Sequence, residues 1–170
     1  VESIKKWASK EGIEFLAIQT GENIDENNGD WEGRTIGITI GGDGTFLEGV
    51  RIFSPRKIPF IGVGSGTLSF LSRVEPEEIF DALEEILKGG SNIDELQMVS
   101  VKVDSFEAEG LNEVVIGHVW PKKPTERKIS SIDVFAGGEH IGKYDGTGIA
   151  VTTPTGSTGL SLSAGGPIHY

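Results

Sequence analysis

A glycine-rich pentapeptide places the tightest limit on how this chain folds. Gly41-Gly42-Asp43-Gly44-Thr45 follows a β-branched run at residues 35–40 and precedes a segment whose apolar spacing becomes helical. This order predicts a strand, a glycine turn and the start of a helix. Glycines let a backbone approach a ligand closely, and the first N–H groups of a helix attract phosphate. The sequence therefore predicts an anion-binding loop at residues 41–45.

Asp43 is unusual in such a loop, because it places a carboxylate where an anion is expected. One interpretation is that Asp43 binds a metal ion, or acts as a base towards a hydroxyl group beside the phosphates. The other is that it only supports a tight turn, as Asp often does. The pentapeptide alone leaves both interpretations open.

The first half of the chain alternates helical and strand-like segments. Spacing predicts helices at residues 1–10, 46–53 and 75–88, and strands at 15–19, 35–40 and 60–63, with a polar surface loop at 22–33. This alternation predicts an α/β domain over residues 1–93, built on a parallel, doubly wound sheet. A second glycine loop, at 62–68, follows the strand at 60–63. Ligands of such sheets lie beyond the carboxyl ends of the strands, where both glycine loops fall.

The second half changes character near residue 94. Strand-like runs at 99–103, 114–119, 129–135 and 149–153 are separated by short turns at Gly137-Gly138 and Asp145-Gly146. The sequence therefore predicts an all-β, antiparallel domain over residues 94–170, which is too short to look complete.

Composition excludes several classes of function. The net charge is −11, from 26 acidic and 15 basic residues, and this argues against binding to nucleic acids or anionic membranes. No apolar run reaches the roughly 20 residues that span a bilayer. Cysteine is absent, which excludes disulfides and thiolate sites, and the three histidines lack the spacing of metal ligands.

Two further motifs have the chemistry of nucleotide contacts. Asn112-Glu113 offers an amide and a carboxylate for ribose hydroxyls or a carboxamide, although a simple turn into a strand explains the pair as well. Residues 152–159 concentrate hydroxyl groups beside glycine, as a polar nucleotide pocket requires. The alternative for that segment is a solvated polar loop.

Taken together, these motifs resemble the NAD kinase family. The resemblance rests on Gly41 to Thr45, residues 62–71, the run 111–115 around Asn112-Glu113, and residues 153–158 with 161–167, in that order. It implies an N-terminal α/β domain and a C-terminal β domain with the active site between them. It also implies transfer of the ATP γ-phosphate to the adenosine 2′-hydroxyl of NAD, with a divalent metal such as Mg²⁺. Polyphosphate is the alternative donor.

The resemblance also assigns roles to residues. Asp43 would accept the 2′-hydroxyl proton, and Asn112 with Glu113 would hold the ribose or nicotinamide of NAD. The other implied NAD- or ATP-binding residues are Gly42, Gly44, Thr45, Thr155, Ser157, Thr158, Gly159, Leu160 and Ser163.

The chain departs from the family pattern at four places. Gly64 replaces the usual Asn of the second glycine loop, and Gly159-Leu160 replaces the usual Ala-Tyr. Thr147 aligns with the usual Asp, while Asp145 lies two positions earlier. Lys128 is the candidate for an expected basic residue.

The resemblance further implies a homodimer or homotetramer in the cytoplasm, and a chain without the family's first strand and closing segment. Two other functions remain open from the sequence. One is a non-catalytic NAD- or NADP-binding protein. The other is a kinase of lipids or sugars that shares the Gly-Gly-Asp-Gly-Thr loop.

Overall fold

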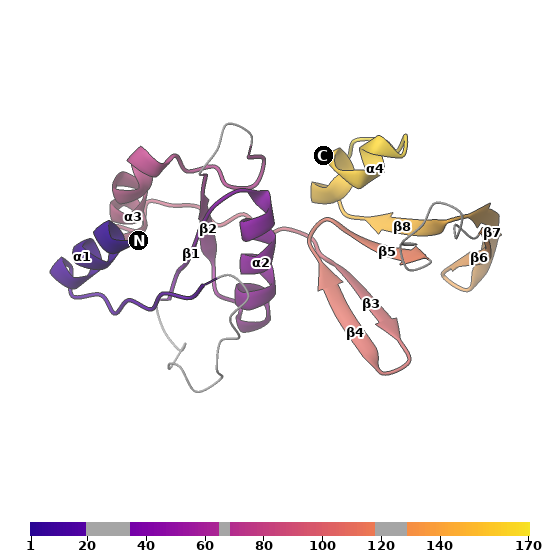
Figure 1. Ribbon diagram of the computed structural model, residues 1–170, viewed down its shortest axis with the longest axis horizontal. Coiled ribbons are helices and arrows are strands. Elements are labelled where there is room, and N and C mark those ends of the chain that lie inside the picture. Colours follow the sequence, from indigo (N-terminus) through magenta and orange to yellow (C-terminus); the bar gives the residue numbers. More distant parts are fainter. Residues whose placement is uncertain (20–34, 65–68, 118–128) are drawn as a thin grey trace. The chain divides into compact units, whose positions relative to one another are not determined.

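The computed structural model describes residues 1–19, 35–64, 69–117 and 129–170, and it divides into two units, Val1–Asp94 and Glu95–Tyr170 (Figure 1). The first unit is α/β and the second is rich in β-strands, which confirms the predicted fold class. In the first unit the order is α1 (Glu2–Lys10), β1 (Gly37–Ile40), α2 (Asp43–Phe53), the 3-10 turn η1 (Ser54–Arg56), β2 (Phe60–Val63), the 3-10 turn η2 (Pro76–Glu78) and α3 (Ile79–Leu87).

Strands β1 and β2 are parallel and in register from Gly37 opposite Phe60 to Ile40 opposite Val63. Side chains alternate between the two faces of the pair. On one face the ring of Phe60 packs against Phe46 and Phe53 of α2, with ring centroids 4.7 and 5.2 Å away. α2 therefore covers this face.

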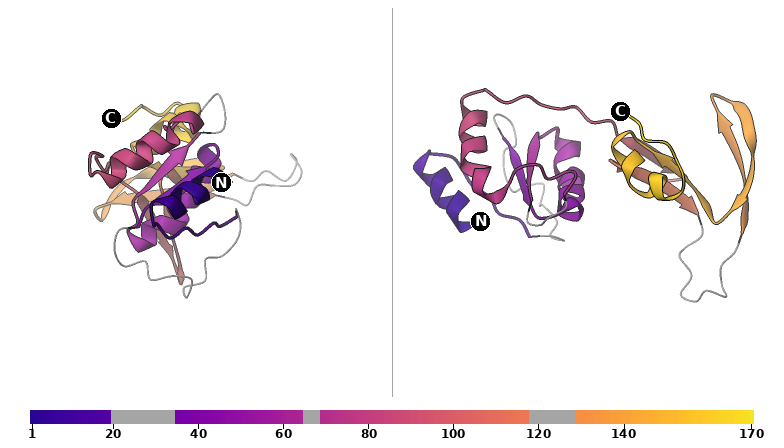
Figure 2. Two further views of the ribbon diagram at one scale, coloured as in Figure 1. Left: turned by 90° about the vertical axis from the view of Figure 1, so that its left-hand side faces the viewer. Right: turned by 90° about the horizontal axis from the view of Figure 1, so that it is seen from above.

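The opposite face of the pair carries the core of the first unit. Val63 packs there with Ile4 of α1 and with Ile79 and Leu83 of α3. Figure 2 shows α1 and α3 on one side of the strand pair and α2 on the other. The doubly wound arrangement follows from this placement, because the strands are buried from both sides.

The strand predicted at residues 15–19 is wrong. These residues are irregular, and Phe15 instead packs against the core formed by α1, α3 and β2. The apolar run thus reflects burial of a side chain and not backbone pairing. The surface loop predicted at 22–33 lies outside the described residues. Helices α1 and α3 lie within the predicted ranges, whereas α2 begins at Asp43, three residues before the predicted start, because the last part of the glycine loop is its first turn.

In its described residues, 95–117 and 129–170, the second unit contains three antiparallel strand pairs. β3 (Val99–Val103) pairs with β4 (Phe106–Gly110), β5 (Glu113–Gly117) with β8 (Gly148–Thr152), and β6 (Ser130–Ala136) with β7 (Glu139–Gly146). A 3-10 turn η4 (Thr155–Thr158) and a short helix α4 (Leu160–Ser163) follow β8.

Of the two turns predicted in this unit, the one at Gly137-Gly138 is confirmed and the one at Asp145-Gly146 is not. Gly137 and Gly138 have φ values of 60° and 86° and connect β6 to β7, as type I′ turns require. The turn predicted at Asp145-Gly146 is wrong, because β7 continues through Gly146 and the chain bends at Thr147 before β8 begins at Gly148. Of the helices that the structure describes, none is long and apolar enough to cross a membrane.

Ser72 gives a prediction about stability. The residue is 6% exposed, and its hydroxyl oxygen is buried without a hydrogen-bond partner among the described residues. Because an unpaired buried hydroxyl is costly, Ser72→Ala is expected to raise the free energy of unfolding by about 1 kcal/mol. Urea denaturation measures this change, and Ser9→Ala, at an exposed hydroxyl on α1, is the control. A loss of stability in Ser72→Ala would contradict the prediction.

Candidate functional site

The glycine loop brings Asp43 to the carboxyl end of β1. Gly42 is the N-cap of α2 and Asp43 is its first residue. Phe46 N–H donates to Gly42 O, so the helix itself provides no partner for the amides of Asp43, Gly44 and Thr45. These amides and the helix dipole are suited to an anionic group at this end of the sheet.

Gly41 explains why the loop needs glycine. Its φ is 156°, and a Cβ atom there would lie 2.3 Å from Thr45 Oγ1. Its N–H donates to Val63 O of β2, which fixes the loop to the edge of the sheet. A side chain at Gly41 would therefore displace Thr45 or open the loop.

The carboxylate of Asp43 is held by the turn at residues 69–72. Asp43 Oδ1 accepts hydrogen bonds from Ser69 Oγ at 2.6 Å, from Leu71 N at 3.0 Å and from Phe70 N at 3.1 Å. Phe70 N also lies 3.2 Å from Asp43 Oδ2. Asp43 thus connects the glycine loop at residues 41–45 to the turn at residues 69–72. Asp43 therefore supports a turn, as the alternative interpretation proposed, but that turn is at residues 69–72 and not in the glycine loop itself.

These hydrogen bonds change the acidity of Asp43. Partial burial tends to raise its pKa, but the bonds from Ser69 Oγ and from the amides of Leu71, Phe70 and, least, Ser72 outweigh this effect and lower the pKa below that of an ordinary aspartate. The carboxylate is therefore ionised at neutral pH.

The lowered pKa predicts how stability depends on pH. A group whose folded-state pKa is depressed stabilises the fold above its unfolded value of about 3.9, and this contribution is lost as the pH falls through the folded-state pKa. The difference in free energy of unfolding between wild type and Asp43→Asn is expected to shrink over that acidic range. Urea denaturation from pH 6 to pH 2 measures it. A difference that stays constant over that range would contradict the prediction.

The second unit brings the Asn112-Glu113 motif against the hydroxyl-rich segment. Glu113 lies opposite Thr152 in the β5–β8 pair. Thr153 N–H donates to Asn112 O at 2.9 Å, and Thr153 Oγ1 donates to Leu111 O and accepts from Gly156 N. Two motifs forty residues apart in sequence thereby form one local structure.

Within this structure Ser157 is internal. It is 0% exposed, and its Oγ donates to Pro154 O at 2.6 Å and accepts from His169 N at 3.0 Å. Ser157 therefore holds η4 to residue 169, and its hydroxyl does not face solvent. Thr155 is half-buried, whereas four predicted site residues are exposed along the end of the chain: Thr158, Gly159, Leu160 and Ser163.

Glu113 has an unpaired oxygen close to these exposed residues. Its Oε2 is buried without a hydrogen-bond partner among the described residues, and it lies 3.9 Å from the position a Cβ at Gly159 would take. A buried carboxylate oxygen without a donor is costly, so a ligand hydroxyl at this point would satisfy it.

Asp145 and Thr147 lie elsewhere in the unit. Gly148 pairs with Gly117 at one end of β5–β8, and Thr152 pairs with Glu113 at the other. Thr147 therefore lies beyond the end remote from Glu113, about 17 Å along the strands. Asp145 is exposed on β7 and accepts a hydrogen bond from Ser131 Oγ. Lys128 lies outside the described residues.

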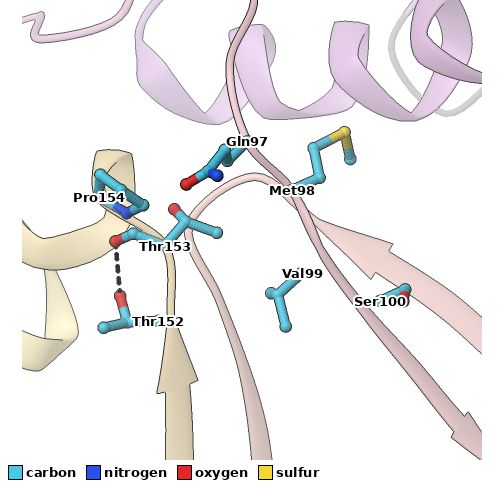
Figure 3. Close-up of a pocket in the computed structure, with 7 residues that line it drawn as sticks. All are labelled: Gln97, Met98, Val99, Ser100, Thr152, Thr153 and Pro154. Carbon is cyan, nitrogen blue, oxygen red and sulfur yellow. Dashed lines mark hydrogen bonds between the residues drawn. The ribbon is translucent and has the colours of Figure 1, made fainter.

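A pocket of about 410 Å³ adjoins the hydroxyl-rich segment (Figure 3). Thr152, Thr153 and Pro154 form one side, and Thr152 Oγ1 donates to Thr153 O within it. The other side, which sequence reasoning did not single out, is Gln97, Met98, Val99 and Ser100. No sequence motif includes these four residues. Only the folded structure shows that they line a pocket together with Thr152, Thr153 and Pro154.

The fold and these loops define a protein with an α/β unit, whose glycine loop lies at the carboxyl ends of parallel strands, and a β-rich unit with a hydroxyl-rich loop. The ATP-NAD kinase N-terminal domain matches residues 27–91, and the ATP-NAD kinase C-terminal domain matches residues 111–169. The chain belongs to the NAD kinase family.

Relatives and solved structures agree with this assignment. The NAD kinase of Fusobacterium nucleatum is 39% identical over 131 residues, which cover 77% of this chain and 48% of that protein. The NAD kinase of Gemmatimonas aurantiaca is 41% identical, with 77% and 46% covered. This chain thus spans about half the length of these curated relatives.

Two solved structures have a similar fold. Yeast NADH kinase complexed with NADH has a TM-score of 0.67 at 30% identity, covering 79% of this chain and 40% of that one. An Archaeoglobus fulgidus NAD kinase in complex with ATP has a TM-score of 0.70 at 24% identity, covering 99% and 62%.

Proposed function

We propose that this chain belongs to an NAD kinase that transfers the γ-phosphoryl group of ATP to the adenosine 2′-hydroxyl of NAD, giving NADP and ADP. The observation that carries the proposal is the ordered match of both family domains to one chain. Curated proteins named NAD kinase, 35–41% identical to the chain, support it. The complexes of similar proteins with NADH and with ATP support NAD and ATP as the two substrates.

In this proposal Asp43 is the general base. Its carboxylate accepts the proton of the 2′-hydroxyl as that oxygen forms a bond to the γ-phosphorus and the bond to the ADP oxygen breaks. A carboxylate with a lowered pKa is a weak base, but phosphoryl transfer passes through a loose transition state and depends mainly on positioning and charge neutralisation. An ionised carboxylate fixed by a turn meets that need.

Other residues bind and orient the substrates. The amides at Gly42, Gly44 and Thr45 neutralise phosphate charge at the start of α2. Asn112 and Glu113 hold the ribose or nicotinamide of NAD, with Glu113 Oε2 accepting from a hydroxyl. The proposed adenosine pocket consists of Thr158, Gly159, Leu160 and Ser163.

The family also implies a divalent metal ion. Within the part of the chain that the structure describes, no three His, Cys, Asp or Glu side chains gather as a metal site. The described residues therefore hold no ready-made site of three such ligands, and we assign no step to a metal. Mg²⁺ commonly reaches such sites bound to nucleotide phosphates, so the assay below contains it.

The assay uses the full-length protein with NAD, ATP and Mg²⁺, and NADP is measured with an NADP-specific dehydrogenase. NADP formation is expected with ATP, and a parallel reaction with polyphosphate identifies the donor. No NADP with either donor, from a protein that binds NAD, would instead support a non-catalytic NAD- or NADP-binding protein. The observations that favour this second function are Thr147 and Leu160, which stand where the family pattern has Asp and Tyr.

We extend the proposal to a cytoplasmic homodimer or homotetramer. Support for association comes from large apolar side chains exposed on the strands of the second unit, including Phe106 at 61% and Phe135 at 62%. Light scattering on the full-length protein checks it, and a monomer would contradict it.

A further inference from the structure

The turn that holds Asp43 contains a hydroxyl group whose direction is fixed. Ser69 Oγ accepts a hydrogen bond from Ser72 N at 3.0 Å, and it lies 2.6 Å from Asp43 Oδ1. An amide nitrogen only donates, and an ionised carboxylate only accepts. The hydroxyl proton of Ser69 must therefore point to Asp43.

This bond makes the two oxygens of Asp43 unequal. Among the described residues, Oδ1 has donors at Ser69, Phe70 and Leu71, whereas Oδ2 has a share of the Phe70 N–H at 3.2 Å. A carboxylate offers about four lone-pair sites in total, two on each oxygen. Oδ2 is thus the oxygen with acceptor capacity left for a ligand.

We propose that Ser69 is a positioning residue, which holds the Asp43 carboxylate in one orientation so that Oδ2 faces the hydroxyl that loses its proton. The inference rests on the proposed function and names the supporting residue and the reacting oxygen of the same site. Ser69 itself touches no substrate in this account. It acts through Asp43.

The side chain of Ser69 contributes something that the turn's amides do not. Phe70 N and Leu71 N reach Asp43 through the backbone, and they remain in any substitution of residue 69. The short Ser69 contact is the single side-chain bond to Asp43 among the described residues. Removing it frees the carboxylate to rotate while the turn keeps its amide bonds.

No neighbouring charge complicates the titration of Asp43. The shift arises from burial and hydrogen bonds within the described residues, without a contribution from the charged Glu48 on α2 or Arg73 after the turn. The charged partner of Arg73 is Asp94, with 3.9 Å between Arg73 Nη1 and Asp94 Oδ2. A change in the pKa of Asp43 on substituting Ser69 therefore reports on their hydrogen bond.

The test compares Ser69→Ala and Ser69→Thr in the full-length protein. Carbon NMR of the Asp43 carboxyl is expected to show a pKa raised by about half a unit to one unit in Ser69→Ala. The kcat for NADP formation is expected to fall about tenfold while the KM for NAD changes less than about twofold, because binding is retained and orientation is lost. Ser69→Thr keeps the hydroxyl and is expected to restore both values.

Ser72→Ala is the matched control for the titration. It removes a hydroxyl from the same turn but keeps the backbone N–H that donates to Ser69. The Asp43 pKa is expected to stay within about 0.2 of wild type in this variant. A shift as large as that of Ser69→Ala would show that any change in the turn moves the pKa, and would overturn the role of Ser69.

Failure of this inference differs from failure of the proposed function. Active wild type with an unaltered kcat or Asp43 pKa in Ser69→Ala overturns the role of Ser69 alone. Wild type that makes no NADP overturns the proposed function, and with it the role of Ser69 in orienting a base.

Discussion

Replacing Asp43 with Asn is expected to lower kcat for NADP formation by about 100- to 1,000-fold. The amide cannot accept the proton of the 2′-hydroxyl at neutral pH, although its shape matches the carboxylate. Asn retains an oxygen to accept from Ser69, Phe70 and Leu71, so the turn and the glycine loop are expected to keep their arrangement. The KM for NAD should change little, which steady-state kinetics with varied NAD will measure.

The control for Asp43→Asn is Asp81→Asn. Asp81 is exposed on α3, and its replacement makes the same change of charge and shape away from the glycine loop. We expect wild-type kcat from that variant. A wild-type kcat in Asp43→Asn itself would show that Asp43 is not the general base. Its role would then be structural, through its hydrogen bonds to the turn at residues 69–72.

Gly156→Ala is expected to destabilise the second unit by about 3 kcal/mol or more. A Cβ at this position would lie 2.0 Å from the carbonyl oxygen of Asn112 and 2.7 Å from its Cα. These are backbone atoms, and hydrogen bonds from Thr153 hold them in place, so they cannot move aside as a flexible side chain would. Urea denaturation followed by circular dichroism measures the loss.

Gly146→Ala is the matched control in the same unit. Its added Cβ would lie 3.7 Å from Gly148 O and 4.0 Å from Gly148 N, which are ordinary contacts. We expect a change of less than about 1 kcal/mol there. Equal losses in the two variants would show that the contact of Gly156 with Asn112 is not what makes glycine necessary.

The sequence predicted those parts of the fold that short-range patterns determine. The β-branched run before the glycine loop, the apolar stripe of α3 and the Gly137-Gly138 turn all depend on neighbouring residues, and each forms as expected. The predicted strand at 15–19 failed because an apolar run does not reveal whether its backbone finds a partner. β4 and most of β7 were missed because their residues include many Glu, Gly and Lys, which are uncommon in strands.

The candidate site was predicted residue by residue, but not in its contacts. Ser69 lies 26 residues from Asp43, and no local pattern shows that its hydroxyl reaches the carboxylate. The roles of Asn112 and Glu113 came from the family resemblance, whereas their junction with Thr153 and Gly156 needed the pairing of β5 with β8. That same pairing separates Thr147 from them, which sequence order alone did not reveal.

The burial of Ser157 bears on how members of this family are recognised from genome sequences. Its hydroxyl fastens one backbone segment to another, so selection for a stable fold suffices to retain it. A descendant that had lost phosphorylating activity would still need that serine for its fold. With Asp43 as the proposed base, searches for working enzymes should give more weight to the aspartate of the glycine loop than to this serine.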